Sequence, residues 1–75
     1  MVTLTRGPNW KISVYGREHG IPHFHVTGRE FRCSIAIRSL DLLAGEAPAN
    51  VLAAARAWAT EHEAELTAKW QELNG

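Results

Sequence analysis

The chain has 75 residues, enough for one small domain that spans residues 1–75. Its formal net charge of zero argues against a dedicated nucleic-acid-binding protein, and its single cysteine excludes an internal disulfide framework. No apolar run reaches the length of a signal peptide or a membrane span, so we expect a cytoplasmic protein with no membrane contact.

Charge is nevertheless unevenly distributed along the chain. The first forty residues carry six Lys or Arg and two Glu, whereas the remainder carries two Lys or Arg and six Asp or Glu. The first half is therefore suited to an anionic partner, unless the acidic second half is simply the solvated face of a helix.

Alternation of apolar and polar residues predicts three strands in the first half of the chain. Residues 10–15 alternate and end at a glycine, residues 23–26 alternate after a loop, and residues 31–38 show the clearest pattern. Residues 41–44 are a candidate fourth strand.

A two-residue turn at Gly28 and Arg29 is predicted to join the second and third strands as a type II′ hairpin. The resulting register pairs apolar with apolar residues and polar with polar residues. Its pairs are Val26 with Phe31, Phe24 with Cys33, His25 with Arg32, and His23 with Ser34.

The last third of the chain, from Pro48 to Leu73, is typical of one amphipathic helix. Its apolar stripe comprises Val51, Leu52, Ala55, Trp58, Ala59, His62, Leu66, Trp70 and Leu73. Thr60 and Glu63 could form a capping box that divides the helix, but the stripe keeps its phase across that point, so we prefer one helix.

These elements predict an α+β fold: a three- or four-stranded antiparallel sheet with one long C-terminal helix packed on its apolar face. Such a helix is about 39 Å long, whereas a globule of this size is about 30 Å across. We therefore expect Trp70 and Leu73 to overhang the sheet and to bind a partner protein or a second copy of the chain.

Three of the four histidines, His19, His23 and His25, lie within seven residues. The alternation places His23 and His25 on the sheet face away from the helix. That face is basic and rich in hydroxyl groups, since it also carries Lys11, Ser13, Tyr15, Arg32 and Ser34. The fourth histidine, His62, lies on the helix stripe, and we interpret it as a core or interface residue.

Several interpretations of the three clustered histidines are open. His23 and His25 on one strand face, with His19 as a third ligand from the loop, fit a catalytic zinc site. Two imidazoles can instead act as base and acid on RNA, whose 2′-hydroxyl is the nucleophile, while Arg32 or Arg17 stabilises the phosphorane-like charge. The histidines can also be exposed structural residues, or can bind a ligand without chemistry.

The histidine segment resembles a known group of short bacterial proteins, domain-of-unknown-function family 4160. The hallmark of that family is a histidine, a gap, then Pro-Pro-His-Phe-His and a small apolar residue. Here the segment reads His19-Gly20-Ile21-Pro22-His23-Phe24-His25-Val26, with Ile21 in place of the first proline. The resemblance covers nearly the whole chain: it continues through Ser34 to Ile37, Leu40 to Gly45, Pro48, Trp58, His62, Glu65, Leu66 and Trp70.

The resemblance implies a β-β-β-α fold and a component of a type II toxin–antitoxin pair, and it favours the acid–base interpretation. We therefore predict a toxin that is a small endoribonuclease. Its expected catalytic residues are His23, His25 and His19, and its expected RNA-binding residues are Arg32, Arg17, Tyr15 and Lys11. No cofactor is expected, with zinc on the three histidines as the alternative. The expected partners are a cognate antitoxin and RNA, and the alternative function is a non-enzymatic binding module of such an operon, or a histidine metal-binding protein.

Overall fold

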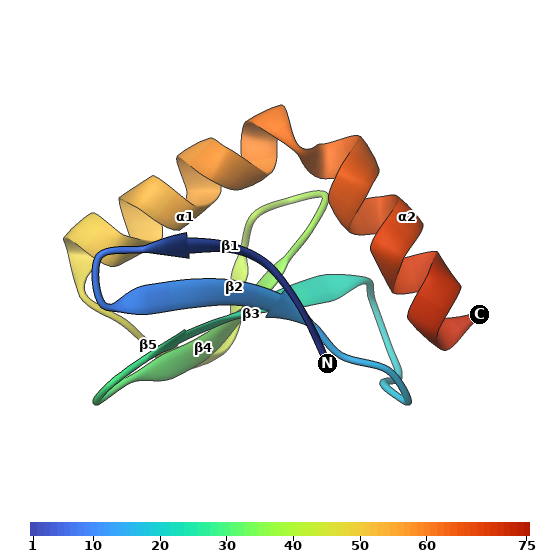
Figure 1. Cartoon of the computed structure of the whole chain (residues 1–75), viewed down its shortest axis with the longest axis horizontal. Helices are drawn as coiled ribbons and strands as arrows, with labels where there is room; N and C mark the ends of the chain where they lie inside the picture. The colour runs from blue at the N-terminus through green and yellow to red at the C-terminus, as the bar shows by residue number, and fades with distance from the viewer.

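Five strands form one antiparallel sheet in which neighbours in sequence are also neighbours in space (Figure 1). The computed structural model describes residues 1–75 throughout. The strands are β1 (Val2–Gly7), β2 (Trp10–Val14), β3 (His23–Gly28), β4 (Arg32–Ala36) and β5 (Leu42–Glu46), and two helices follow, α1 (Ala49–Glu61) and α2 (Glu63–Asn74). The predicted α+β class is confirmed, with more strands and one more helix than expected.

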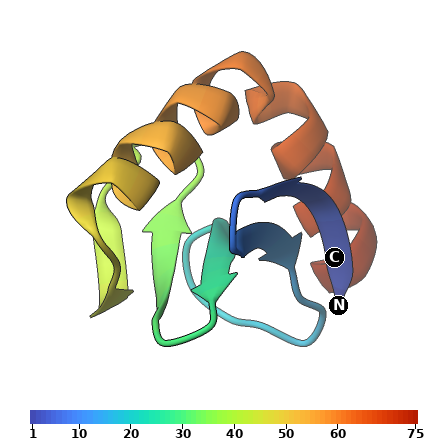
Figure 2. The same ribbon diagram turned by 60° about the vertical axis from the view of Figure 1, so that its left-hand side comes forward.

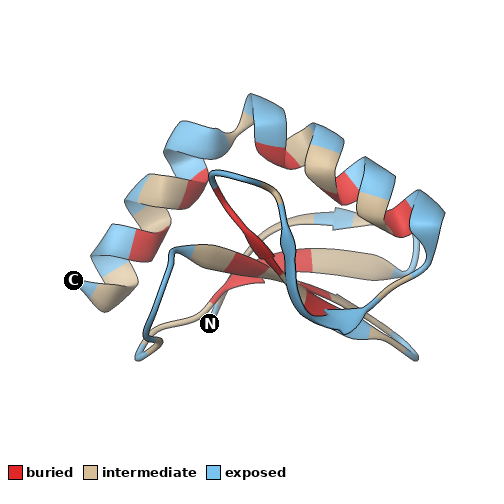
Figure 3. Cartoon of the chain, turned by 180° about the vertical axis from the view of Figure 1, so that it is seen from behind, coloured by how far each residue is buried: buried red, intermediate tan, exposed pale blue.

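The two helices cover one face of the sheet, and the core lies between them and the strands (Figures 1 and 3). Alternate residues of β2, β3 and β4 point into this core, as the sequence pattern predicts. The buried cluster comprises Ile12, Val14, Phe24, Val26, Cys33, Ile35, Ile37, Val51, Ala55, Ala59, Leu66 and Trp70. The opposite face of β3 is therefore free to carry polar side chains.

The two edge strands depart from the sequence prediction. The alternation predicts no strand before residue 10, yet β1 pairs with β2 along its whole length. Its register shifts between Thr3 and Thr5, so its pattern is interrupted, as is usual at a bulged edge strand. At the other edge, β5 confirms the candidate fourth strand but begins one residue later and extends to Glu46.

The register of the hairpin between β3 and β4 differs from the predicted one by two residues. The observed pairs are His23 with Ala36, Phe24 with Ile35, His25 with Ser34, Val26 with Cys33, and Thr27 with Arg32. The turn consists of Arg29 and Glu30, and the Gly28 amide donates to the Phe31 carbonyl at 2.9 Å to close it. The Phe31 ring lies over Gly28, where a Cβ atom would collide with it. Because side chains alternate with a period of two, this shift leaves every residue on its predicted face.

The predicted single helix is wrong: the helix breaks at His62, and α1 and α2 meet there at an angle (Figures 1 and 2). In a continuous helix the His62 amide would donate to the Trp58 carbonyl. Instead the His62 ring donates to that carbonyl through Nδ1 at 2.7 Å, and the His62 amide donates to Ala59 at 3.1 Å. A side chain inserted into the helix ladder is a recognised cause of a kink. Thr60 donates to the Arg56 carbonyl and forms no capping box.

The break also removes the expected overhang. The molecule measures 31 × 22 × 19 Å, which is shorter than the uninterrupted helix would be. Because the chain bends at His62, α2 descends along the end of the sheet, and Leu66 and Trp70 are buried within the core. His62 itself is half-buried and its ring stacks on Trp58 with centroids 4.1 Å apart. Neither helix is long and apolar enough to cross a membrane.

Candidate functional site

Two histidines of β3 and one glutamate from the preceding loop converge on a single point. His23 and His25 are two residues apart on one strand, so their rings project from the same face. The loop between β2 and β3 returns over that face and carries Glu18. Glu18 Oε1 lies 2.6 Å from His25 Nε2 and 3.1 Å from His23 Nε2. The three groups offer ligand atoms that all lie within 4.8 Å of one another.

The other ring nitrogen of each histidine also has a polar neighbour. His23 Nδ1 donates to the Ile21 carbonyl at 2.9 Å, because a carbonyl oxygen can only accept. The Nε2 atom of a neutral His23 therefore presents its lone pair to the Glu18 carboxylate, which is repulsive unless a proton or a cation lies between them. His25 Nδ1 lies 3.5 Å from the Ser34 hydroxyl.

The charge of Glu18 is stabilised by the two imidazoles. The hydrogen bond with His25 is the main cause that lowers the pKa of the Glu18 carboxyl below its usual value, partial burial opposes it, and the electrostatic interactions with His25 and His23 add to the lowering. The side chains of Glu18, His23 and His25 are 28%, 12% and 25% exposed. A small ion or a water molecule can therefore reach the cluster from solvent.

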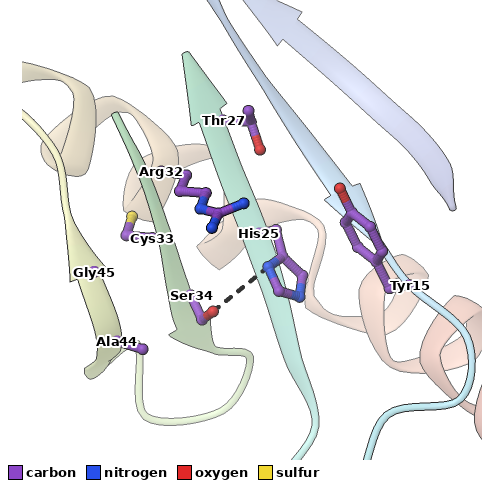
Figure 4. Close-up of a pocket in the computed structure, with 8 residues that line it drawn as sticks. All are labelled: Tyr15, His25, Thr27, Arg32, Cys33, Ser34, Ala44 and Gly45. Carbon is purple, nitrogen blue, oxygen red and sulfur yellow. Dashed lines mark hydrogen bonds between the residues drawn. The ribbon is translucent and has the colours of Figure 1, made fainter. Parts of the chain in front are cut away.

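A cavity of about 280 Å³ adjoins His25 on the sheet face away from the helices (Figure 4). Its lining residues are Tyr15, His25, Thr27, Arg32, Cys33, Ser34, Ala44 and Gly45. The Tyr15 ring stands edge-on to the His25 ring with centroids 4.4 Å apart. The Arg32 side chain extends from β4 across β3 on the same side as His25, and it forms no ion pair (Figure 4). An imidazole, a phenol and an unpaired guanidinium therefore share one cavity.

The other residues predicted for the site lie elsewhere. His19 is exposed in the loop and is absent from the cluster, where Glu18 takes the place expected for it. Arg17 is also exposed and has a positive φ of 61°. Lys11 lines a separate hollow with Arg6 and Trp10. Of the predicted RNA-binding residues, only Tyr15 and Arg32 lie beside a clustered histidine.

Two residues of the site were missed by sequence reasoning. Glu18 precedes His19 directly, but nothing in the local pattern indicates which of the two side chains turns toward β3. Trp70 was expected to overhang, whereas its ring lies 4.8 Å from the His23 ring, measured between centroids. The one signal in the sequence was that a single helix of this length would be longer than the sheet, which indicated that the end carrying Trp70 could not continue straight along the sheet.

The fold and the cluster together define a small α+β domain with a Glu-His-His site beside one face of the sheet. The family described as "Domain of unknown function (DUF4160)" matches residues 9–71, and the chain belongs to this family. No curated protein and no solved structure matches the chain.

Proposed function

We propose that this protein binds one divalent metal ion, zinc in the first place, through Glu18, His23 and His25. The observation that carries the proposal is the hydrogen bond from His23 Nδ1 to the Ile21 carbonyl, because in neutral His23 it leaves the Nε2 lone pair directed at a carboxylate oxygen. Metal-binding histidines commonly donate their second ring N–H to a backbone carbonyl in this way. A cation between Nε2 and Oε1 turns a repulsive contact into two favourable ones.

The donor set agrees with this proposal. Imidazole nitrogen suits zinc, copper, iron and nickel, and two histidines with one carboxylate are a common set of protein ligands in catalytic centres. In the metal-bound form His25 Nε2 is the ligand, so the remaining ring proton moves to Nδ1, where the Ser34 hydroxyl is the nearby acceptor. The three ligands come from one strand and the loop before it, which leaves the side toward solvent open.

We further propose that the site cleaves phosphodiester bonds in RNA and that the protein is the toxin of a toxin–antitoxin pair. A divalent ion with three protein ligands keeps a coordination position for water or substrate and activates that water for hydrolysis. The cavity beside His25 supports the choice of substrate, because Arg32 is an unpaired cation and Tyr15 offers a ring and a hydroxyl group. Guanidinium groups bind phosphate strongly and in a directed way.

A metal-free acid–base mechanism is the second candidate, and the contact of Glu18 with both imidazoles favours it. The carboxylate would stabilise the protonated form of either ring, as general acid catalysis requires. Both Nε2 atoms point at one oxygen, however, whereas in-line displacement needs the base and the acid on opposite sides of the phosphorus. We therefore place this mechanism second.

Zinc titration of chelator-treated protein tests the proposal. In competition with a chromogenic chelator, the unchanged protein is expected to bind one zinc ion. His25→Ala should weaken binding by at least the roughly 10–100-fold typical of a lost second-shell contact. His19→Ala is the matched control, because His19 lies in the same segment outside the cluster, and its affinity should be unchanged. An unchanged affinity in His25→Ala contradicts the site.

Incubation with structured RNA then separates the two mechanisms. Cleavage that stops in chelator and returns with zinc supports the metal site as the catalyst. Cleavage that persists in chelator supports the acid–base mechanism. RNA that stays intact under both conditions, with folded protein free of any antitoxin, contradicts the nuclease and leaves metal binding alone.

A further inference from the structure

The third ligand of the proposed centre depends on a contact far away in the sequence. The backbone of His25 is paired with Ser13 of β2 and Ser34 of β4, and that of His23 is paired with Ala36 of β4. Glu18 instead lies in the connection between β2 and β3, outside any helix or strand. Its position must therefore be determined by contacts other than a sheet ladder.

Asn74, in the last turn of α2, supplies those contacts. Its side-chain Oδ1 accepts a hydrogen bond from the Glu18 amide at 2.7 Å, and its Nδ2 donates to the Tyr15 carbonyl at 2.9 Å. The same Nδ2 donates to the Trp70 carbonyl at 3.2 Å, within α2 itself. One carboxamide thus ties the loop at both Tyr15 and Glu18 to the helix.

The rest of the same helix end reinforces this attachment. The Leu73 carbonyl faces Gly16, the residue that follows Tyr15, at a distance that would place it in van der Waals contact with a Cβ atom added there. The Trp70 ring, which is 7% exposed, lies 4.8 Å from the His23 ring. The final turns of α2 therefore contact the backbone of Glu18 and the ring of His23, two of the three proposed ligands.

We infer that Asn74 is a positioning residue for the metal centre and that docking of the last turn of α2 completes the site. This inference rests on the proposed function. Without Asn74 the loop loses both of its hydrogen bonds to α2, and Glu18 is released from the position that faces the two imidazoles. His23 and His25 stay in place, because β3 lies inside the sheet.

The first test measures zinc affinity in a double-mutant cycle with Asn74→Ala and Glu18→Gln. Asn74→Ala is expected to weaken zinc binding by about 10–100-fold, as for other groups that orient a ligand. In the Glu18→Gln background the same change should alter the affinity by less than about threefold, because the carboxylate that Asn74 positions is already absent. Equal losses in both backgrounds, or no loss in either, overturn the inference.

Gln71→Ala is the matched control for this cycle, since Gln71 is an exposed residue one turn earlier in α2. Its zinc affinity should equal that of the unchanged protein. Circular dichroism at the assay temperature checks that every variant is folded. A loss of affinity in Gln71→Ala as large as that in Asn74→Ala shows a general effect of α2 and also overturns the specific role of Asn74.

A second readout does not need a metal. In metal-free protein the Glu18 amide should exchange slowly with solvent, because Asn74 accepts its hydrogen bond, and Asn74→Ala should accelerate that exchange at least tenfold while leaving the amides of β3 protected. A Glu18 amide that exchanges rapidly in the unchanged protein contradicts the inference. If the amide is protected but the unchanged protein binds no zinc, the proposed function fails and the positioning of Glu18 by Asn74 stands.

Discussion

Truncation of Leu66 tests whether α2 belongs to the core. Leu66 is 0% exposed and is the central apolar residue of α2, so Leu66→Ala removes a fully buried side chain. Changes of this kind cost about 2–5 kcal/mol. A domain of this length has a total free energy of unfolding of about 4–11 kcal/mol, so the variant should lose a large share of it. Each kcal/mol lowers the midpoint temperature by roughly 4–8 °C in a domain of this size.

Urea and thermal unfolding, followed by circular dichroism, measure this loss. The exposed Gln71→Ala variant serves as the control within the same helix and should stay within about 0.5 kcal/mol of the unchanged protein. An overhanging helix end would make both changes equally mild. A loss below about 1 kcal/mol for Leu66→Ala would refute the docking of α2, and with it the argument for Asn74.

Three further predictions concern the sheet and the helix break. Gly45→Ala should destabilise more than Gly20→Ala in urea unfolding, because both glycines have positive φ but only a Cβ at Gly45 collides with the Arg32 carbonyl; equal costs would contradict the observed β4–β5 register. Cys33 should react slowly with a thiol reagent until the protein unfolds, since it is 3% exposed and burial raises the pKa of its thiol; fast labelling of the folded protein would contradict its burial. Because the folded pKa of this thiol is raised, its contribution to stability is fully present below pH 9.0, the unfolded pKa, and is lost as the pH rises through the folded pKa. His62→Ala should make the helix junction straighter, because the ring no longer takes the Trp58 carbonyl; unchanged backbone chemical shifts around residue 62 would assign the break to another cause.

The faces of the central strands could be predicted from sequence, but their register could not. Period-two alternation in β2, β3 and β4 places each residue on the correct face. A slip of two residues preserves that pattern, so alternation alone cannot distinguish the predicted hairpin from the observed one. In the observed hairpin the turn consists of Arg29 and Glu30, and the Phe31 ring lies over Gly28. That contact has no signature in the pattern.

The helix break occurs at His62, which occupies a regular position in the apolar stripe of the predicted helix. The stripe keeps its phase through His62, and Leu66 is buried as that phase predicts, whereas Trp70 is buried although it was expected to overhang. Because the stripe is continuous, it does not indicate that the His62 ring donates a hydrogen bond to the Trp58 carbonyl. The mismatch in length between helix and globule was visible in the sequence, but it was resolved by a bend and not by an overhang.

Only the part of the candidate site that depends on local residue spacing could be predicted from the sequence. His23 and His25 follow from two positions on one strand face. The choice between Glu18 and His19 is made by a loop whose direction depends on Asn74, 56 residues beyond Glu18 in sequence. A contact between residues so far apart cannot be predicted from the sequence of the loop alone.

X-ray absorption spectroscopy of the zinc-loaded protein tests the central claim most directly. We expect two imidazole nitrogens and at least one carboxylate oxygen around the zinc, at about 2.0–2.2 Å. The signal of one imidazole should disappear in His25→Ala and should be unaffected in His19→Ala. A spectrum with three imidazoles would contradict Glu18 as a ligand and would indicate His19 in its place. A spectrum without imidazole scattering would contradict a metal centre at these residues.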